Sequence, residues 1–307
     1  MSSLPDTTGH LTRQRPWTAV LRSDRFFWAV CLVPPFAILA AVFVYPLAVS
    51  FQSSLTNESI LTETVFIGLR NYQRALADAN AMQSLRFTLL FSTVCLVVQM
   101  VVGFVLAALL QKITIGRGLF RTLVIIPLML TPVVMALQWR MMMNYDFGIL
   151  NYFVGLLGFE PQGWTLNPTA AFVSVVLVDT WHNVGFVAML ISAGMATLPT
   201  EPFEAAEVDG ASAWQRLWHL TVPLLRPVIV VALLFRAYGL LRTFDLIFAL
   251  TQGGPGRATE TFSYHIYQSM FLAWQIGYSS ALGYILLAIT LAVCVVLIFF
   301  VDVEEDV

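Results

Sequence analysis

Six long apolar runs dominate this sequence and restrict it to folds that cross a membrane. A helix needs roughly 20 apolar residues to cross the hydrocarbon core of a bilayer. Only 11% of the residues are charged, against roughly 25% in soluble domains. We therefore predict an all-α polytopic membrane protein with six transmembrane helices. The predicted spans are 26–51, 87–110, 122–143, 169–196, 228–250 and 279–301.

Prolines interrupt two of these runs. Pro34, Pro35 and Pro46 fall in the first run, and Pro127 and Pro132 fall in the third. A proline removes one backbone donor and kinks or breaks a helix, which membrane helices tolerate when neighbouring groups satisfy the freed carbonyls. We therefore expect kinks or breaks in both runs. The first run is too long for the core of a signal peptide, so we expect it to remain as a span.

Basic residues in the connections predict the orientation of the spans. Six spans place both termini on one side of the membrane, and that side carries nine Lys and Arg residues outside the spans, against four on the other. Because the side richer in Lys and Arg is cytoplasmic, we predict cytoplasmic termini and a cytoplasmic connection at 199–227. The predicted organisation is an N-terminal cytoplasmic segment (1–25), a transmembrane domain (26–301) and a cytoplasmic acidic tail (302–307).

The polar connection 199–227 carries the signals of a short helix at its start. Thr200 can cap this helix, and Pro202 suits its first turn. Glu204 favours the positive end of the helix dipole. Asp209-Gly210 should end the helix, because glycine readily adopts the left-handed conformation that follows a helix.

A second short helix is predicted after the glycine. Ser212 and Gln215 have the spacing of a capping box. Trp214, Leu217 and Trp218 share one face of this helix, which is typical of a segment lying along a membrane surface. The connection is thus predicted to be two short helices around a tight turn.

This connection resembles the EAA loop of binding-protein-dependent ABC importer permeases. The family pattern is Glu-Ala-Ala, three residues, Gly, nine residues, Ile, one residue and Leu-Pro. The present chain has EAAEVDG and, nine residues later, LTVP, in which Leu220 and Val222 keep the apolar character of the two substituted positions. The resemblance implies that a partner ATPase receives the first helix and drives the permease through it. The coupling residues implied are Glu204, Ala205, Ala206, Asp209 and Gly210.

Other segments are similar to the carbohydrate branch of these importers. They are FIGLRNY from residue 66, WHNVGFVAMLISAGMATLP from residue 181 and LRTFDLIFALTQGGPGRATET from residue 241. The last is similar to the first permease of maltose, trehalose and glycerol-3-phosphate systems. The resemblance implies a permease in a prokaryotic cell membrane that translocates a sugar, most simply a di- or oligosaccharide, by alternating access.

The resemblance also implies a set of partners. They are a second homologous permease, an ABC ATPase dimer and an extracytoplasmic solute-binding protein. The chain has one lysine, Lys112, which follows Gln111, so it contains no Gly-Lys-Ser/Thr nucleotide-binding motif. We therefore expect no cofactor and no metal on this chain, with ATP and Mg²⁺ bound by the partner ATPase.

Polar residues inside the spans are costly and usually face a cavity or a partner. Asp179 and Arg236 either pin helix packing or face the translocation path, and the sequence leaves both interpretations open. Arg242 and Asp245 are three residues apart, so a continuous helix would place them on one face, where they can pair. His182 is expected to be a packed, hydrogen-bonded histidine.

A sugar offers hydroxyl groups and apolar ring faces, so its path needs amide or carboxylate partners beside aromatic platforms. Residues of these types occur together in spans four and five, with Asn183 and Tyr238 as the first candidates. The predicted substrate-path residues are Asn183, Tyr238, Trp181, Phe244, Arg242 and Asp245.

Three alternatives remain at this stage. Arg236 and Arg242 would suit glycerol-3-phosphate or another phosphorylated polyol, because an anion favours such partners. An integral-membrane enzyme could begin from Asp179 and His182, but the sequence supplies no third catalytic group. A passive channel would not need an exposed docking loop.

Overall fold

The computed structural model describes residues 24–59 and 63–302. Most of the predicted N-terminal segment and acidic tail lie outside these residues. Within the described ranges the regular secondary structure is helical, with an isolated bridge between Thr56 and Phe66. The chain divides into two compact units, residues 1–52 and 53–307.

The described part of the first unit is one long apolar helix. It comprises α2 (Asp24–Leu39), a π-helical turn (Ala40–Val44) and α3 (Tyr45–Ser54). The helix is not interrupted at the prolines: Pro34 and Pro35 lie inside α2, and a π-helical turn directly precedes the segment that contains Pro46. Residues Val30–Ser54 are therefore long and apolar enough to form one span.

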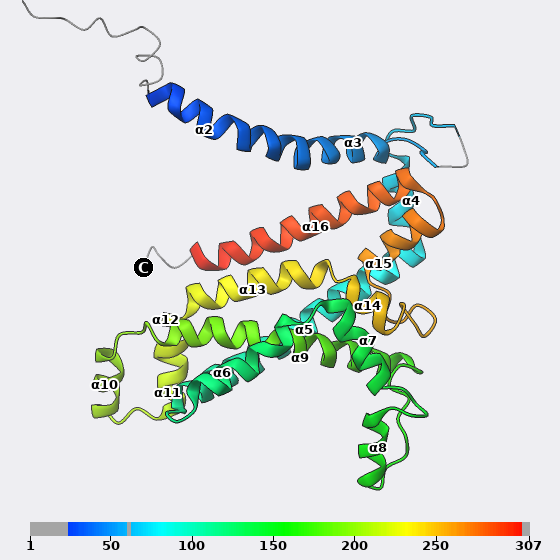
Figure 1. Cartoon of the computed structure of the whole chain (residues 1–307). Coiled ribbons are helices and arrows are strands. Elements are labelled where there is room, and N and C mark those ends of the chain that lie inside the picture. The colour runs from blue at the N-terminus through cyan, green and yellow to red at the C-terminus, as the bar shows by residue number, and fades with distance from the viewer. Residues whose placement is uncertain (1–23, 60–62, 303–307) are drawn as a thin grey trace, which may run out of the picture. The chain divides into compact units, whose positions relative to one another are not determined.

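The second unit is built on three long helices. They are α5 (Ala79–Lys112), α9 (Pro168–Met195) and α16 (Ile276–Asp302). Helices α5 and α9 pack along each other, and α13 (Arg226–Leu241) packs against α16, α5 and α9. Figure 1 shows these helices crossing the unit from one end to the other.

Two predicted spans are broken. The third consists of α6 (Arg117–Ile125), a 3-10 turn (Ile126–Met129) and α7 (Pro132–Met142), with a 95° bend. The fifth ends its first helix at Leu241 and resumes as α14 (Asp245–Leu250). The described residues hold four helices able to span a membrane, or up to six if each of two bent pairs is one span. These pairs are Arg117–Met129 with Pro132–Met142, and Ala213–Leu224 with Arg226–Leu241, which are bent by 69°. The all-helical fold prediction is confirmed.

Short helices occupy the two ends of this bundle. At one end lies α10 (Glu201–Val208) with α11 (Ala213–Arg216), and other short helices lie at the opposite end. Because α10 belongs to the predicted cytoplasmic connection, the opposite end is the predicted extracytoplasmic end. The helices there are α4 (Arg70–Ala77), α8 (Ile149–Leu156), α15 (Phe262–Tyr267) and a π-helical turn (Gln268–Leu272).

Helix α9 supports the bend of the third span at two points. His182 Nε2 lies 3.1 Å from the carbonyl oxygen of Leu130, beside the break. Gly185 lies against the backbone of Val124, so that a Cβ added at Gly185 would overlap the Val124 carbonyl oxygen. The prolines permit the bend, and His182 of α9 lies within hydrogen-bonding distance of the Leu130 carbonyl beside it.

Gly185→Ala should therefore destabilise the bend. The added methyl group meets backbone that cannot rotate away, and overpacking of this kind costs about 1–3 kcal/mol. Thermal unfolding of the purified protein measures the loss. Gly283→Ala is the matched control, because Gly283 also lies in a helix and has nothing within 4 Å of an added Cβ. Equal melting temperatures for the two variants would contradict the expected clash.

Candidate functional site

The first candidate site is the exposed turn that follows α10. Gly210 adopts φ +76°, and the Ala211 N–H donates to the Ala206 carbonyl at 2.9 Å while the Gly210 N–H donates to Glu207 at 3.1 Å. This is the hydrogen-bond pattern with which a left-handed glycine ends a helix. At the start of α10, Thr200 occupies the cap position, but its side chain makes no capping hydrogen bond. Its backbone is helical (φ −79°, ψ −31°), whereas a residue that caps a helix with its side chain is typically extended.

The second half of the connection begins as predicted. The Ser212 N–H donates to Gln215 Oε1 at 2.8 Å, and the Gln215 N–H donates to Ser212 Oγ at 3.3 Å, which completes the capping box. The α-helix then lasts four residues before a π-helical turn (Leu217–Thr221) and a short α12 (Val222–Leu224). Trp214 and Trp218 pack edge to face at 5.6 Å and are both exposed.

The two halves form one projecting element. Arg216 pairs with Glu207 at 3.2 Å, which ties the second helix to the first. Of the predicted coupling residues, Ala206 is half-buried, and the others lie on the exposed side. Hollows of about 400 and 450 Å³ flank α10. The exposed coupling residues are Glu204, Ala205, Asp209 and Gly210.

The second candidate site is a buried polar ring formed by Gln99, Asp179 and Arg236, from α5, α9 and α13. Arg236 donates from Nη2 to Asp179 Oδ2 at 2.8 Å and from Nε to Gln99 Oε1 at 2.7 Å. Gln99 Nε2 donates to the same Asp179 oxygen at 2.7 Å. The three residues are at most 8% exposed. Each charge therefore has a partner, as burial requires.

Sequence reasoning missed Gln99. Its only signal is a polar amide in the middle of an apolar run, and nothing local links it to Asp179, 80 residues away. Asn183 adjoins the ring, because its Nδ2 donates to Asp179 Oδ1 at 3.2 Å and to the Asp179 carbonyl at 3.0 Å. Asn183, a predicted substrate-path residue, therefore contacts Asp179 directly.

The other predicted path residues lie in separate places. Trp181 is 37% exposed and packs edge to face on Trp139 at 5.4 Å. Phe244 stacks on Phe248 at 5.4 Å and lies 5.1 Å from the ring of Tyr267. Among the described residues, no hydrogen bond or ring contact joins Asn183 or Trp181 to the other four predicted path residues, and the substrate path stays a prediction.

The predicted pairing of Arg242 with Asp245 is wrong. Helix α13 ends at Leu241 and α14 begins at Asp245, so the two residues do not share a helix face. Arg242 instead donates to the hydroxyl of Tyr238, with its guanidinium 4.9 Å from the centre of that ring. Tyr238, Arg242 and Asp245 are all exposed.

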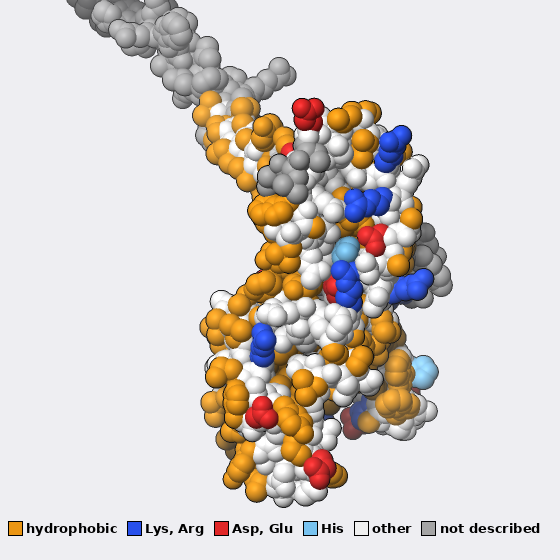
Figure 2. All heavy atoms as spheres, turned by 90° about the vertical axis from the view of Figure 1, so that its right-hand side faces the viewer, with side chains coloured by type: hydrophobic (Ala, Val, Ile, Leu, Met, Phe, Trp, Pro, Cys, Tyr) orange, Lys and Arg blue, Asp and Glu red, His pale blue; other side chains and the backbone are white. Residues whose placement is uncertain are grey.

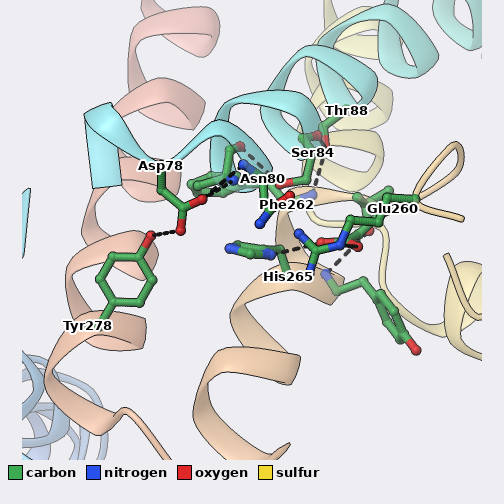
Figure 3. Close-up of polar contacts among 12 residues, drawn as sticks. Asp78, Asn80, Ser84, Thr88, Glu260, Phe262, His265 and Tyr278 are labelled. Carbon is green, nitrogen blue, oxygen red and sulfur yellow. Dashed lines mark hydrogen bonds and ion pairs between the residues drawn. The ribbon is translucent and has the colours of Figure 1, made fainter. Parts of the chain in front are cut away.

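A third polar cluster closes the end of the unit opposite α10 (Figure 3). His265 Nδ1 lies 2.8 Å from the buried carboxylate of Glu260, which also pairs with Arg257 at 3.4 Å. Asp78 caps α5 and accepts the Tyr278 hydroxyl at 2.8 Å. The Asp78–Tyr278 bond joins α5 to α16, and the Phe262 N–H joins α15 to α5 by donating to Thr88 Oγ1 at 2.8 Å.

The pKa of Asp78 reflects competing influences. Burial raises it, but the hydrogen bonds from Tyr278 and from the Asn80 and Ala81 N–H groups, with the nearby His265, outweigh burial. The net result is a pKa below the ordinary aspartate value. Asp78 therefore stabilises the fold above the unfolded pKa, about 3.9, and this contribution is lost as pH falls through the lower native pKa.

Asp78→Asn should lower the melting temperature at neutral pH and lose that effect in acid, because the protonated wild-type carboxyl no longer differs in charge from the amide. Melting temperatures of both proteins from about pH 7 down to pH 3 measure the difference. Asp146→Asn, at an exposed aspartate, is the control and should track wild type throughout. A difference that stays constant over the whole range would contradict the assigned pKa.

The apolar helices place the chain among integral-membrane proteins, with a projecting helix–glycine–helix element and a buried ion pair. Residues 99–304 match the family model described as "Binding-protein-dependent transport system inner membrane component". The chain belongs to this family.

Several relatives are carbohydrate transport permeases by name. The trehalose/maltose permease MalF of Thermococcus litoralis is 36% identical over 76% of this chain and 79% of its own. The sulfoquinovosyl glycerol permease SmoG of Agrobacterium fabrum is 32% identical over 94% and 95%. The crystal structure of a bacterial alginate importer gives a TM-score of 0.79 at 20% identity, over 94% and 98% of the two chains.

Family membership establishes the general role of the chain. It is a multi-pass inner-membrane permease of an ABC importer, and a separate ATPase subunit hydrolyses ATP. Permeases of this family carry no cofactor of their own. The family resemblance predicted from the EAA loop is confirmed, and the alternative of an integral-membrane enzyme is not supported.

Proposed function

We propose that this permease translocates a neutral di- or oligosaccharide by alternating access. Two named relatives act on such substrates: MalF of Thermococcus litoralis and the trehalose permease SugA of Mycobacterium tuberculosis, which is 34% identical over 90% of this chain. The aromatic groups at Trp181, Phe244 and Tyr238, with the amide of Asn183, are the types that sugar rings and hydroxyls need.

The observation that carries the choice of a neutral substrate is the buried polar ring. Asp179 neutralises Arg236 at 2.8 Å, and Gln99 occupies the guanidinium Nε. An anionic substrate would have to displace a buried carboxylate to reach this arginine. A sugar requires no such exchange, because its hydroxyls can bond to amides and carboxylates as they stand.

We further propose that the working unit contains the expected partners. These are a second homologous permease, an ATPase dimer and an extracytoplasmic solute-binding protein. A solved bacterial alginate transporter at 19% identity is in complex with its pentasaccharide-bound periplasmic protein, which supports a similar arrangement here. The ATPase would contact Glu204, Ala205, Ala206, Asp209 and Gly210, which form α10 and its turn.

A phosphorylated polyol is the second candidate, and Arg242 is the observation that favours it. This arginine is exposed and contacts Tyr238, so its guanidinium could also meet an anion. The glycerol-3-phosphate permease UgpA of Agrobacterium fabrum is 31% identical over 88% of this chain.

Reconstituted transporter distinguishes the two candidates. The permeases, the ATPase and the binding protein are placed in proteoliposomes, and ATP hydrolysis and uptake are measured with trehalose, maltose or glycerol-3-phosphate. Trehalose or maltose should stimulate both in wild type and in Arg242→Gln. Stimulation by glycerol-3-phosphate alone, lost in Arg242→Gln, would replace the proposed substrate class by the second candidate.

A further inference from the structure

The connection between α7 and α9 contains the short helix α8. One face of this helix is apolar and exposed: Ile149, Tyr152, Phe153 and Leu156 follow the i, i+3, i+4, i+7 spacing and are 49–67% exposed. The opposite face carries the buried amide of Asn151. Helices of soluble proteins turn their apolar stripe inward, so α8 has the reverse arrangement. These four residues are called the α8 stripe.

The hairpin that presents the α8 stripe is built around Asn151. Its Nδ2 donates to the carbonyls of Tyr145 and Gln162, each at 3.1 Å. Its Oδ1 accepts the Gln162 N–H at 3.0 Å and the Trp164 Nε1–H at 2.9 Å. One buried amide thereby fixes both arms of the hairpin. The exposure of the stripe is a feature of an ordered element.

The hairpin is also fastened to α9. Ser174 Oγ donates to the Trp164 carbonyl at 2.8 Å, and the side chain of Asn167 caps α9 by accepting the Ala170 N–H at 2.8 Å. Helix α8 lies at the end of α9 away from α10, and its axis runs across that of α9 (Figure 1). A helix that crosses the direction of the spans at their end lies parallel to the membrane surface.

Apolar surface continues from the spans into the hairpin. Met141 at the end of α7 and Val173 near the start of α9 are 67% and 54% exposed. Figure 2 shows hydrophobic side chains on the lower part of this end of the molecule, interspersed with polar groups. The surface that faces lipid along the spans therefore reaches the α8 stripe.

We propose that α8 is an interfacial helix, with the α8 stripe lying in the headgroup–acyl boundary of the outer leaflet. Tyrosine and other amphipathic aromatics concentrate at this depth, and a helix with one apolar face binds there in the membrane plane. The hairpin 143–167 carries Asp146 and Glu160 but no Lys or Arg. It therefore needs no anionic lipid and should bind a zwitterionic surface.

Lipid fits the α8 stripe better than a protein partner that binds and dissociates. A docking protein that dissociates in each cycle would leave the aromatic and aliphatic side chains in water, and contiguous exposed apolar patches are unfavourable. Lipid covers them at every stage. Since the hairpin is fastened to α9, this contact would also hold the outer end of α9 at a fixed depth.

Site-directed spin labelling of the assembled transporter in phosphatidylcholine nanodiscs tests this proposal. Cys31 and Cys294 are replaced, and the buried Cys95 is left in place. Labels at Tyr152→Cys and Leu156→Cys should relax more with oxygen than with a water-soluble nickel chelate. Labels at Glu160→Cys and Asp146→Cys should show the opposite preference. Phe153→Cys substitutes for either stripe position if that variant does not assemble.

Two results would overturn the proposal. Nickel access at the stripe equal to that at Glu160 would place the α8 stripe in water. An immobilised label that neither reagent reaches would indicate a protein partner instead of lipid. Neither result depends on the transported substrate, so the test is independent of the proposed function.

Discussion

Arg236→Leu should lower the stability of the assembled permease by about 3–5 kcal/mol, the usual cost of breaking a buried ion pair by removing one partner. The substitution leaves the Asp179 carboxylate buried with only amide partners, and it leaves Gln99 Oε1 without its donor. Melting temperature in a single detergent, with the amount of assembled complex, measures the loss. Arg140→Leu is the control, since Arg140 is exposed and makes one 3.3 Å bond to the Ala249 carbonyl.

The companion variants separate charge from shape. Arg236→Lys keeps the charge but cannot reach both Gln99 and Asp179 with a fixed fork, so it should lie between wild type and Arg236→Leu. Adding Asp179→Asn to Arg236→Leu should recover part of the stability, because no uncompensated charge remains. A double variant no more stable than Arg236→Leu would contradict an electrostatic role for the pair, and the double-mutant cycle gives its size.

The position of the buried polar ring suggests why the permease keeps an expensive ion pair in its spans. It joins α9 to α13, and these two helices flank the projecting α10–α12 element in the sequence. A displacement of that element therefore acts on two helices that are already tied together. The third member, Gln99, extends the tie to α5.

Local features of this structure could be predicted, whereas long-range contacts could not. The capping box at Ser212 and Gln215 and the left-handed turn at Gly210 depend on residues within one helical turn, so spacing alone predicts them. The buried polar ring joins residues 80 and 57 positions apart, and no local pattern encodes such a contact. The same limit hid the α8 hairpin, whose arms are joined through Asn151.

Breaks in the helices were the second limit on what the sequence could predict. The pairing of Arg242 and Asp245 was predicted from a spacing that holds only in an unbroken helix. In the structure α13 ends at Leu241, directly before Arg242, and α14 begins at Asp245. Prolines indicated a bend in the third span, but its 95° angle depends on α9, where His182 and Gly185 meet the bent chain. Sequence thus indicates where a helix can bend, and packing determines how far.

Gly210→Pro should abolish transport and transport-coupled ATP hydrolysis while the spans still fold. Proline fixes φ near −65°, but Gly210 requires +76°, and the substitution removes the N–H that bonds to Glu207. The α10 turn must then change course. Nothing lies within 4 Å of an added Cβ at this position, so the expected effect comes from the required φ and from the lost N–H, not from a Cβ overlap.

A graded series tests that cause. Asn tolerates the left-handed conformation, so Gly210→Asn should retain most activity, and Gly210→Ala, which pays roughly 1–2 kcal/mol for it, should be intermediate. Coupled hydrolysis, uptake and copurification with the ATPase are measured for each variant. Full uptake and coupled hydrolysis in Gly210→Pro would show that α10 and its turn do not transmit the ATPase cycle. A loss shared equally by all three variants would instead point to the glycine surface itself as the contact, since asparagine keeps both the left-handed conformation and the N–H that proline loses.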